Sequence, residues 1–300
     1  MKASNERRNP PACRSAKFST RRGARQRKAT MLDELKQRLE PLCADGIALA
    51  FSGGVDSSLL LAVLAEMRRE RPFPLVALTM RTVLQPPAES AEAAAFAGRF
   101  GVEHHIFTFD PLSIDEVRRN RVDRCYHCKK AVFALFWKYA AEHGFKHVVD
   151  GTNGDDARVY RPGRKALRES GVLSPLSGFS KSDIRALSAR LGLPTASKPA
   201  APCLATRFEY DTVLTEDAIE RVERGEAFLK NLFPDVQNVR LRVHKNLARI
   251  EVSAPAIPAV AARAAEIAAE MKRLGFDFTT LDLDGFRSGC FDFNLKGNEL

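Results

Sequence analysis

The stretch "GIALAFSGGVDSSLLLAVL", residues 46–64, decides the fold. Residues 46–51 form a continuous apolar run, which is typical of a strand buried on both faces of a parallel sheet. Residues 57–70 predict a helix that ends in charged side chains. Glycines, serines and one aspartate lie between the two, at the carboxyl end of the strand. In a parallel sheet this is the edge at which ligands bind.

The polar turn between strand and helix has the parts of a polyphosphate site. Its two glycines allow the backbone to approach a ligand closely and to adopt positive φ. The amides that enter the helix lie at the positive end of the helix dipole, and serine hydroxyls can donate to phosphate oxygens. Asp56 suits Mg²⁺ binding or orientation of the loop. The turn lacks the lysine of the G-x-x-x-x-G-K-[ST] phosphate loop, so it belongs to a different kind of site.

The rest of the chain predicts a doubly wound α/β sheet with right-handed crossovers, followed by a smaller α+β domain. In the first part we expect strands at 73–80, 103–109 and 146–152, and helices at 87–101, 129–144 and 180–193. After the break at 198–202 the order becomes α-β-β-α-β, with helices at 215–232 and 257–275 and strands at 238–244, 248–253 and within 278–289. The predicted divisions are 1–30, 31–206 and 207–300.

Residues 1–30 are a basic tail that we expect to be disordered. They hold ten Lys or Arg and one acid, and so carry nine of the ten net positive charges of the chain. Three interpretations are open: a segment that binds RNA or an acidic partner, a targeting peptide, or a start codon placed upstream of the native one. We favour the third, because Met31 opens a helix with leucines at helical spacing, Leu32, Leu35 and Leu39.

Composition restricts the function classes. Without the tail the chain is nearly neutral, which argues against nucleic-acid binding. We find no run of about 18 apolar residues, so we expect no membrane span. Six cysteines without a signal peptide or a dense framework indicate a reducing, cytoplasmic compartment.

Three cysteines have spacing or context that suggests chemistry. Cys125 and Cys128 form a CxxC ahead of the helix expected at 129–144, and are open to interpretation as metal ligands, buried thiols or a redox dithiol. The chain has no second CxxC, which excludes a Cys₄ zinc ribbon. Cys203 lies in a proline-punctuated turn near Arg207, and a cationic neighbour favours a reactive thiolate. Asp155 and Arg161 follow the strand at 146–152, where they suit nucleotide, Mg²⁺ or substrate contacts.

The segment "SGGVDS" resembles the PP-loop of the ATP pyrophosphatase superfamily. Together with "DRCYHCKKAVF", "DGTNGDDARVYRPGRKAL", "KPAAPCLATR" and "LDLDGFRSG", it resembles the LarE family of ATP-dependent sulfur transferases over residues 31–292. The resemblance implies adenylation of a carboxylate of pyridinium-3,5-biscarboxylic acid mononucleotide, with release of pyrophosphate. A sulfur nucleophile then displaces AMP to give a thiocarboxylate, in the biosynthesis of the nickel-pincer nucleotide cofactor. ATP would be held, with Mg²⁺, by Ser52, Gly53, Gly54, Asp56, Ser57 and Ser58.

The resemblance also assigns roles to the cysteines. Cys203 matches the sulfur-bearing cysteine of the family and, with Asp56, is the expected catalytic residue. In some members that cysteine gives up its sulfur and becomes dehydroalanine, and those members lack cysteines at positions 125 and 128. This chain has all three, and three thiolates can hold a 4Fe–4S cluster with one iron open for hydrosulfide. Zinc and a sacrificial Cys203 are the alternatives; the other cysteines are expected to be ordinary thiols.

Further residues match substrate contacts of the family. Arg240 and Arg242 lie two apart on one strand and share a face, where the guanidinium forks suit phosphate and carboxylate; the alternative is a solvated strand face. The expected substrate-binding set is Arg207, Arg240, Arg242, Asp155 and Arg161. Glu251 matches a metal-binding or oligomer-contact position, and relatives form hexamers, so we expect a homo-oligomer. The second function considered is a tRNA thiolase with a three-cysteine cluster, which the near-neutral body disfavours.

Overall fold

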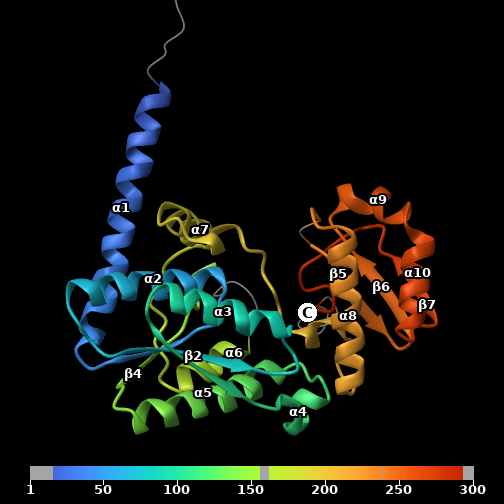
Figure 1. The fold of residues 1–300 in the computed structure, drawn as a ribbon, viewed down its shortest axis with the longest axis horizontal. Coiled ribbons are helices and arrows are strands. Elements are labelled where there is room, and N and C mark those ends of the chain that lie inside the picture. The colour runs from blue at the N-terminus through green and yellow to red at the C-terminus, as the bar shows by residue number, and fades with distance from the viewer. Residues whose placement is uncertain (1–15, 156–161, 237, 293–300) are drawn as a thin grey trace, which may run out of the picture.

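The computed structural model describes residues 16–155, 162–236 and 238–292. The N-terminal unit is built on a parallel sheet with the strand order β3-β2-β1-β4 (Figure 1). These strands are β1 (Ile47–Ala50), β2 (Leu75–Arg81), β3 (Glu103–Thr108) and β4 (His147–Val149). The helices of this unit are α1 (Ala16–Cys43), α2 (Val55–Glu70), α3 (Pro87–Arg99), α4 (Asp115–Arg118), α5 (Arg124–Glu142), α6 (Gly163–Glu169) and α7 (Lys181–Arg190). The unit also contains the short 3-10 helices η1 (Pro111–Ser113), η3 (Pro194–Ser197) and η4 (Leu204–Arg207).

Both faces of this sheet are covered, as the continuous apolar strands require. Along β1, Ile47 and Leu49 pack in a core with α1, α2, α3 and α7, whereas Ala48 packs in a second core with α5 and α6. Alternation along a strand sends successive side chains to opposite faces. The predicted doubly wound α/β arrangement is therefore confirmed.

The C-terminal unit holds the three-stranded sheet β5-β6-β7, with β5 (Arg240–His244), β6 (Leu247–Glu251) and β7 (Phe278–Leu281). β5 and β6 are antiparallel, as the predicted strand pair requires, and β7 lies parallel to β6. Its helices are α8 (Glu216–Leu232), η5 (Ala254–Ala256), α9 (Ile257–Ala261) and α10 (Ala264–Arg273). The core of this unit extends to Leu84 and Val117 of the N-terminal unit and to Leu204 in η4. The boundary at residue 207 stays a prediction.

The largest differences from the expected starts are at α1 and α5. α1 begins at Ala16, so residues 16–30 are helical where we expected a disordered segment. That stretch contains no proline, and a helix propagates readily from a packed turn once it is nucleated. α5 begins at Arg124, which places Cys125 and Cys128 in its first turn rather than ahead of it. None of the described helices is long and apolar enough to cross a bilayer.

We expect removal of residues 1–30 to leave the melting temperature within a few degrees of that of the full chain. The described apolar contacts of α1 begin at Met31, and Leu35 and Leu39 are fully buried. As a control, Leu35→Ala should lower the free energy of unfolding by about 2–5 kcal/mol, because it opens a cavity in a packed core. Thermal denaturation of both variants tests this, and a large loss on truncation would contradict it.

Candidate active site

The turn between β1 and α2 is preformed for an anion. Gly53 has φ +67°, in the left-handed region that favours glycine, and an added Cβ would lie 3.2 Å from the Cβ of Ala93. The hydroxyl of Ser57 lies 3.2 Å from the hydroxyl of Ser52 and 3.3 Å from both the Ser52 amide nitrogen and the Gly54 carbonyl oxygen. These contacts close the turn over the start of α2. Ser52 and Ser57 line a cavity of about 480 Å³.

Ser58 behaves differently from its neighbours. Its side chain is fully buried, and its hydroxyl has no partner within the described part of the chain. Its amide donates to the carbonyl of Gly54 at 3.0 Å, as part of the helix start. An ATP contact from Ser58 stays a prediction.

A lysine reaches the turn from elsewhere in the chain. Lys181, the first residue of α7, forms an ion pair through Nζ with the carboxylate of Asp56. Asn153 donates to the other oxygen of that carboxylate at 3.2 Å. The backbone amide of Lys181 donates to Asp155 Oδ2 at 2.7 Å. Asp155 thus holds the start of α7 in place, and its predicted contact with the substrate stays a prediction. Arg161, the other predicted contact after β4, lies outside the described residues.

The chain after β4 packs directly on the turn. Asp150 is buried and accepts hydrogen bonds from the hydroxyls of Ser174 and Thr152, both at 2.5 Å. These hydrogen bonds hold Gly151 against the turn between β1 and α2. A Cβ added to Gly151 would lie 3.0 Å from the amide nitrogen of Ser57 and 3.1 Å from the Cβ of Asp56. Glycine is therefore required at position 151 because the neighbouring backbone leaves no room for a Cβ, and not because of its backbone φ angle.

We expect Gly151→Ala to lower ATP-dependent pyrophosphate release by about tenfold, because small displacements of reacting groups are costly. The added methyl group must push the backbone of the phosphate-binding turn, and secondary structure by circular dichroism should be retained. Gly98→Ala is the matched control, since an added Cβ there meets nothing within 4 Å. Equal rates in the two variants would contradict the proposed contact.

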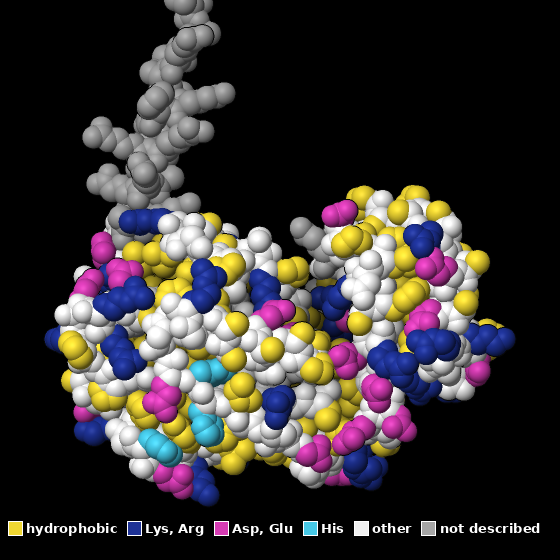
Figure 2. All heavy atoms as spheres, in the orientation of Figure 1, with side chains coloured by type: hydrophobic (Ala, Val, Ile, Leu, Met, Phe, Trp, Pro, Cys, Tyr) yellow, Lys and Arg dark blue, Asp and Glu magenta, His cyan; other side chains and the backbone are white. Residues whose placement is uncertain are grey.

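A second cavity, of about 470 Å³, lies beside the first. Figure 2 shows the surface hollowed between the N-terminal body and the C-terminal lobe. Side chains of the C-terminal unit contribute to the second cavity, among them Arg240, Arg242, Phe286 and Phe291. Five residues line both cavities: Arg124, Cys125, Lys129, Thr152 and Cys203. The wall between the two cavities thus carries two of the three predicted cysteines, and Cys128 lines the first cavity.

The three cysteines interact electrostatically. Burial raises the pKa of Cys128 to about 12, with further contributions from Cys203 and Cys125. Burial also raises the pKa of Cys203 to about 11; Cys125 adds to this, whereas Arg124 and Arg207 oppose it. Arg207 does lower the pKa of Cys203, as expected of a cationic neighbour, but burial outweighs it and the pKa of the thiol is raised overall. A metal would have to displace the thiol protons on binding.

The metal alternatives differ in the ligand geometry that they require. Within the described ranges, no three His, Cys, Asp or Glu side chains are placed to share one metal ion. Ligands of a single zinc must converge on bonds of about 2.3 Å, whereas the ligands of a cluster bond to different irons and lie further apart. Three thiols line the first cavity, and both the iron–sulfur cluster and the zinc alternative stay predictions.

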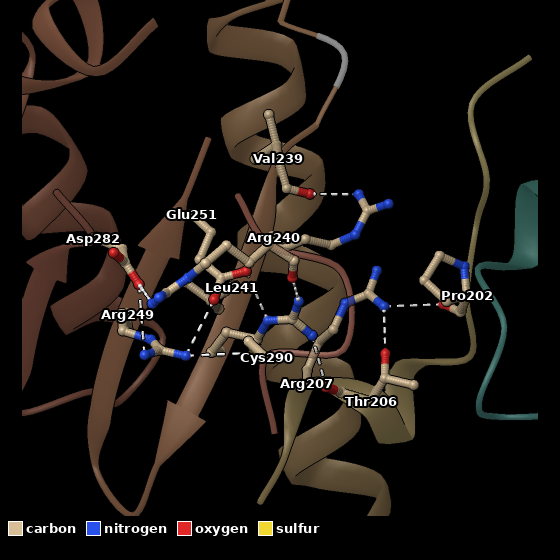
Figure 3. Close-up of polar contacts among 12 residues, drawn as sticks. Pro202, Thr206, Arg207, Val239, Arg240, Leu241, Arg249, Glu251, Asp282 and Cys290 are labelled. Carbon is tan, nitrogen blue, oxygen red and sulfur yellow. Dashed lines mark hydrogen bonds and ion pairs between the residues drawn. The ribbon is translucent and has the colours of Figure 1, made fainter. Parts of the chain in front are cut away.

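Two of the predicted substrate arginines are paired with buried acids; Figure 3 labels Arg207 and Glu251, one member of each pair. Arg207 Nε and Nη2 donate to the two carboxylate oxygens of Glu226 at 2.7 and 3.0 Å. Arg242 Nε donates to Glu251 at 3.0 Å, and Glu251 also accepts from Arg249 at 3.1 Å. All four residues of the Arg207–Glu226 and Arg242–Glu251 pairs are at least 95% buried, so the alternative of a solvated strand face is wrong. Glu251 is held by two arginines, and its metal-binding or oligomer-contact role stays a prediction.

Arg240 has no acid partner among the described residues. Its guanidinium donates to the carbonyls of Val239 at 2.8 Å and Ala200 at 2.9 Å, and lies 5.4 Å from the ring centroid of Phe286. Its Nε is buried without a partner in the part of the chain that the structure describes. Burial and the neighbouring charge of Arg207 lower the pKa of Arg240. Among the three arginines, Arg240 is the one without an acid partner in the described part of the chain, and it lines the second cavity.

Sequence reasoning missed three basic residues of the site. Arg124 and Lys129 flank the CxxC and line both cavities. Their adjacency to the cysteines in the first turn of α5 is a signal that the sequence did contain. Lys181 gave no such signal, because it lies 125 residues from Asp56.

Comparisons with known proteins show the family of the chain. A model of the PP-loop domain matches residues 27–158. Pyridinium-3,5-bisthiocarboxylic acid mononucleotide synthase of Lactiplantibacillus plantarum is 35% identical over 278 residues, which cover 91% of this chain and 96% of that protein. The chain belongs to the LarE family.

Other relatives place the LarE-family chain among PP-loop enzymes. An uncharacterised protein of Synechocystis sp. is 35% identical over 262 residues, covering 86% of this chain and 95% of its own. A tRNA-specific 2-thiouridylase of Thermoanaerobacter sp. is 25% identical over 249 residues, covering 67% of this chain and 65% of that enzyme. The resemblance to the LarE family that the sequence motifs indicated is thus confirmed, and the tRNA thiolases are more distant relatives.

Proposed function

We propose that this protein is an ATP-dependent sulfurtransferase that converts a carboxylate of pyridinium-3,5-biscarboxylic acid mononucleotide into a thiocarboxylate, in nickel-pincer nucleotide cofactor biosynthesis. The observation that carries the proposal is the shared wall between the cavities, with Cys125 and Cys203 in it. One cavity contains the PP-loop and the other the arginines of the C-terminal unit. A carboxylate activated at the wall would meet both AMP and sulfur there.

The PP-loop cavity would hold ATP. The amides at the start of α2 and the hydroxyls of Ser52 and Ser57 would bind the pyrophosphate. Asp56 would hold Mg²⁺, which stabilises charge on the phosphates when bound. Lys181, now paired with Asp56, lies at the same place, so its charge would be available to the phosphates once Asp56 binds the metal.

The second cavity would hold the mononucleotide. Arg240, which lines this cavity and has no acid partner among the described residues, would bind an anionic group. The ion pairs of Arg207 and Arg242 would hold the surrounding side chains in place. The carboxylate oxygen attacks the α-phosphorus of ATP, the bond from that phosphorus to the pyrophosphate oxygen breaks, and an acyl-adenylate forms. Sulfur then attacks the carboxyl carbon, and AMP departs with the original carboxylate oxygen.

The sulfur source in this proposal is a 4Fe–4S cluster held by Cys125, Cys128 and Cys203. When bound, such a cluster supplies an open iron that can carry hydrosulfide. The support is the donor set and the cavity that the three thiols share. If Cys203 instead surrenders its own sulfur, Cys125 and Cys128 have no part in the chemistry. The origin of the sulfide is open.

We also propose a cytoplasmic homo-oligomer. None of the five described cysteines forms a disulfide, as expected in a reducing compartment. The edge strand β7 exposes Phe278, and Leu283 follows it; their relative exposures are 67% and 81%. Such apolar side chains on an open sheet edge suit contact with another copy.

The test compares substrates. Protein reconstituted with iron and sulfide under anaerobic conditions is incubated with ATP and either the biscarboxylic mononucleotide or unmodified tRNA. The proposal predicts AMP, pyrophosphate and a thiocarboxylate with the mononucleotide only. Thiolated tRNA would instead support the second function, that of a tRNA thiolase. We include tRNA in the test because a tRNA-specific 2-thiouridylase is 25% identical to this chain.

A further inference from the structure

The segment 196–203, "ASKPAAPC", leads from η3 to Cys203, and we call it the strap. Beyond η3 it forms neither helix nor strand, and its two prolines lack N–H groups. Arginine side chains donate to its carbonyl oxygens. Arg185 donates to Ala196 at 2.6 Å and to Lys198 at 2.8 Å. Nearer Cys203, Arg240 donates to Ala200 at 2.9 Å and Arg207 donates to Pro202 at 3.0 Å.

The strap also touches the phosphate-binding turn. Lys198 Nζ donates to the carbonyl of Gly53 at 3.2 Å and to Glu92 of α3 at 2.8 Å. The strap therefore connects three parts of the site: the PP-loop at Lys198, the arginines of the second cavity, and Cys203 at its end. The place of Cys203 depends on how this segment is held.

Arg185 differs from the other two arginines of the strap. It belongs to α7, lines neither cavity, and makes no ion pair with any described acid. Both hydrogen bonds of its guanidinium go to the strap, at carbonyls two residues apart. A planar fork with two donors fixes both carbonyls at once, which a single ammonium does not.

We propose that Arg185 is a positioning residue for sulfur transfer. By holding the carbonyls of Ala196 and Lys198, it keeps Cys203 in the wall between the cavities. Its effect on sulfur transfer rests on the proposed function, whereas its effect on the position of Cys203 does not.

The test uses Arg185→Gln, with Arg190→Gln on the same helix as matched control and Arg185→Lys as the conservative variant. In protein prepared without iron, alkylation of Cys203 by iodoacetamide, followed by peptide mass spectrometry, should be about tenfold faster in Arg185→Gln, because two charge-assisted hydrogen bonds are lost. Arg190→Gln should alkylate at the wild-type rate. Arg185→Lys should fall between the two, since it restores one carbonyl contact.

A second readout separates positioning from folding. In reconstituted protein, Arg185→Gln should keep substrate-dependent pyrophosphate release and lose about tenfold in thiocarboxylate formation. Wild-type alkylation rates in Arg185→Gln would overturn the proposal, as would an equal loss of both reactions together with a lowered melting temperature. If wild-type protein releases no pyrophosphate with the substrate, the proposed function fails, while the alkylation comparison still decides the role of Arg185.

Discussion

Asp56→Asn should abolish formation of AMP and pyrophosphate while the protein stays folded. Asparagine keeps the size of the side chain and one oxygen to accept from Asn153, but it removes the charge that would hold Mg²⁺ and that now pairs with Lys181. Metal-assisted charge stabilisation contributes several kcal/mol, so the rate should fall at least about a hundredfold. Pyrophosphate release measured with saturating ATP and substrate checks this.

Two controls make the Asp56 result specific. Asp45→Asn removes a surface acid paired with Lys146, and should leave the rate unchanged. Lys181→Met removes the other half of the Asp56 ion pair and should raise the ATP concentration needed for half-maximal rate. Undiminished pyrophosphate release in Asp56→Asn would refute the assignment of the PP-loop cavity to Mg-ATP.

Single replacement of any of the three cysteines by alanine should empty or cripple the iron–sulfur cluster. Iron content, the visible absorption of the cluster and repeated turnover should fall together in Cys125→Ala, Cys128→Ala and Cys203→Ala, because two thiolates rarely suffice. Cys290→Ala is the matched control. Cys290 lines the second cavity and lies 3.6 Å from Arg249, outside the proposed ligand set.

The sacrificial alternative predicts a different pattern. Only Cys203→Ala would then lose sulfur transfer, and wild-type protein would stop after one turnover, lighter by one molecule of H₂S. Intact-protein mass spectrometry after the reaction separates the two. Dehydroalanine at position 203 in protein that began with a full cluster would contradict the cluster as sulfur source, whereas unmodified Cys203 after several turnovers would contradict the sacrificial donor.

Local patterns predicted the features that depend on a few neighbouring residues. The apolar run at 46–51 contains β1. The turn after it is closed by a contact between the hydroxyls of Ser52 and Ser57, which lie only five residues apart in the sequence. The helix expected at 180–193 became α7, which Ser180 caps with Asp183 completing a capping box. The antiparallel pair β5–β6 follows from two alternating runs separated by a short turn.

Long-range partners were not predictable from the same patterns. Nothing in the spacing of the sequence joins Lys181 to Asp56 or Arg207 to Glu226, since such pairs form only when the sheet and α8 are in place. Burial of the arginines was missed for the same reason: alternation places Arg240 and Arg242 on one face, but does not show what covers that face. The early start of α5 was also missed: Asp123 is a residue type favoured at N-caps, but in the structure it makes no side-chain capping hydrogen bond.

The most direct test of the account follows an oxygen atom. The biscarboxylic mononucleotide is prepared with heavy oxygen in its carboxylates and is incubated with ATP and reconstituted protein. Activation of the carboxylate by adenylation predicts one heavy oxygen in each AMP released and a thiocarboxylate that has lost one. AMP free of the label, formed together with thiocarboxylate, would contradict the acyl-adenylate on which the whole account depends.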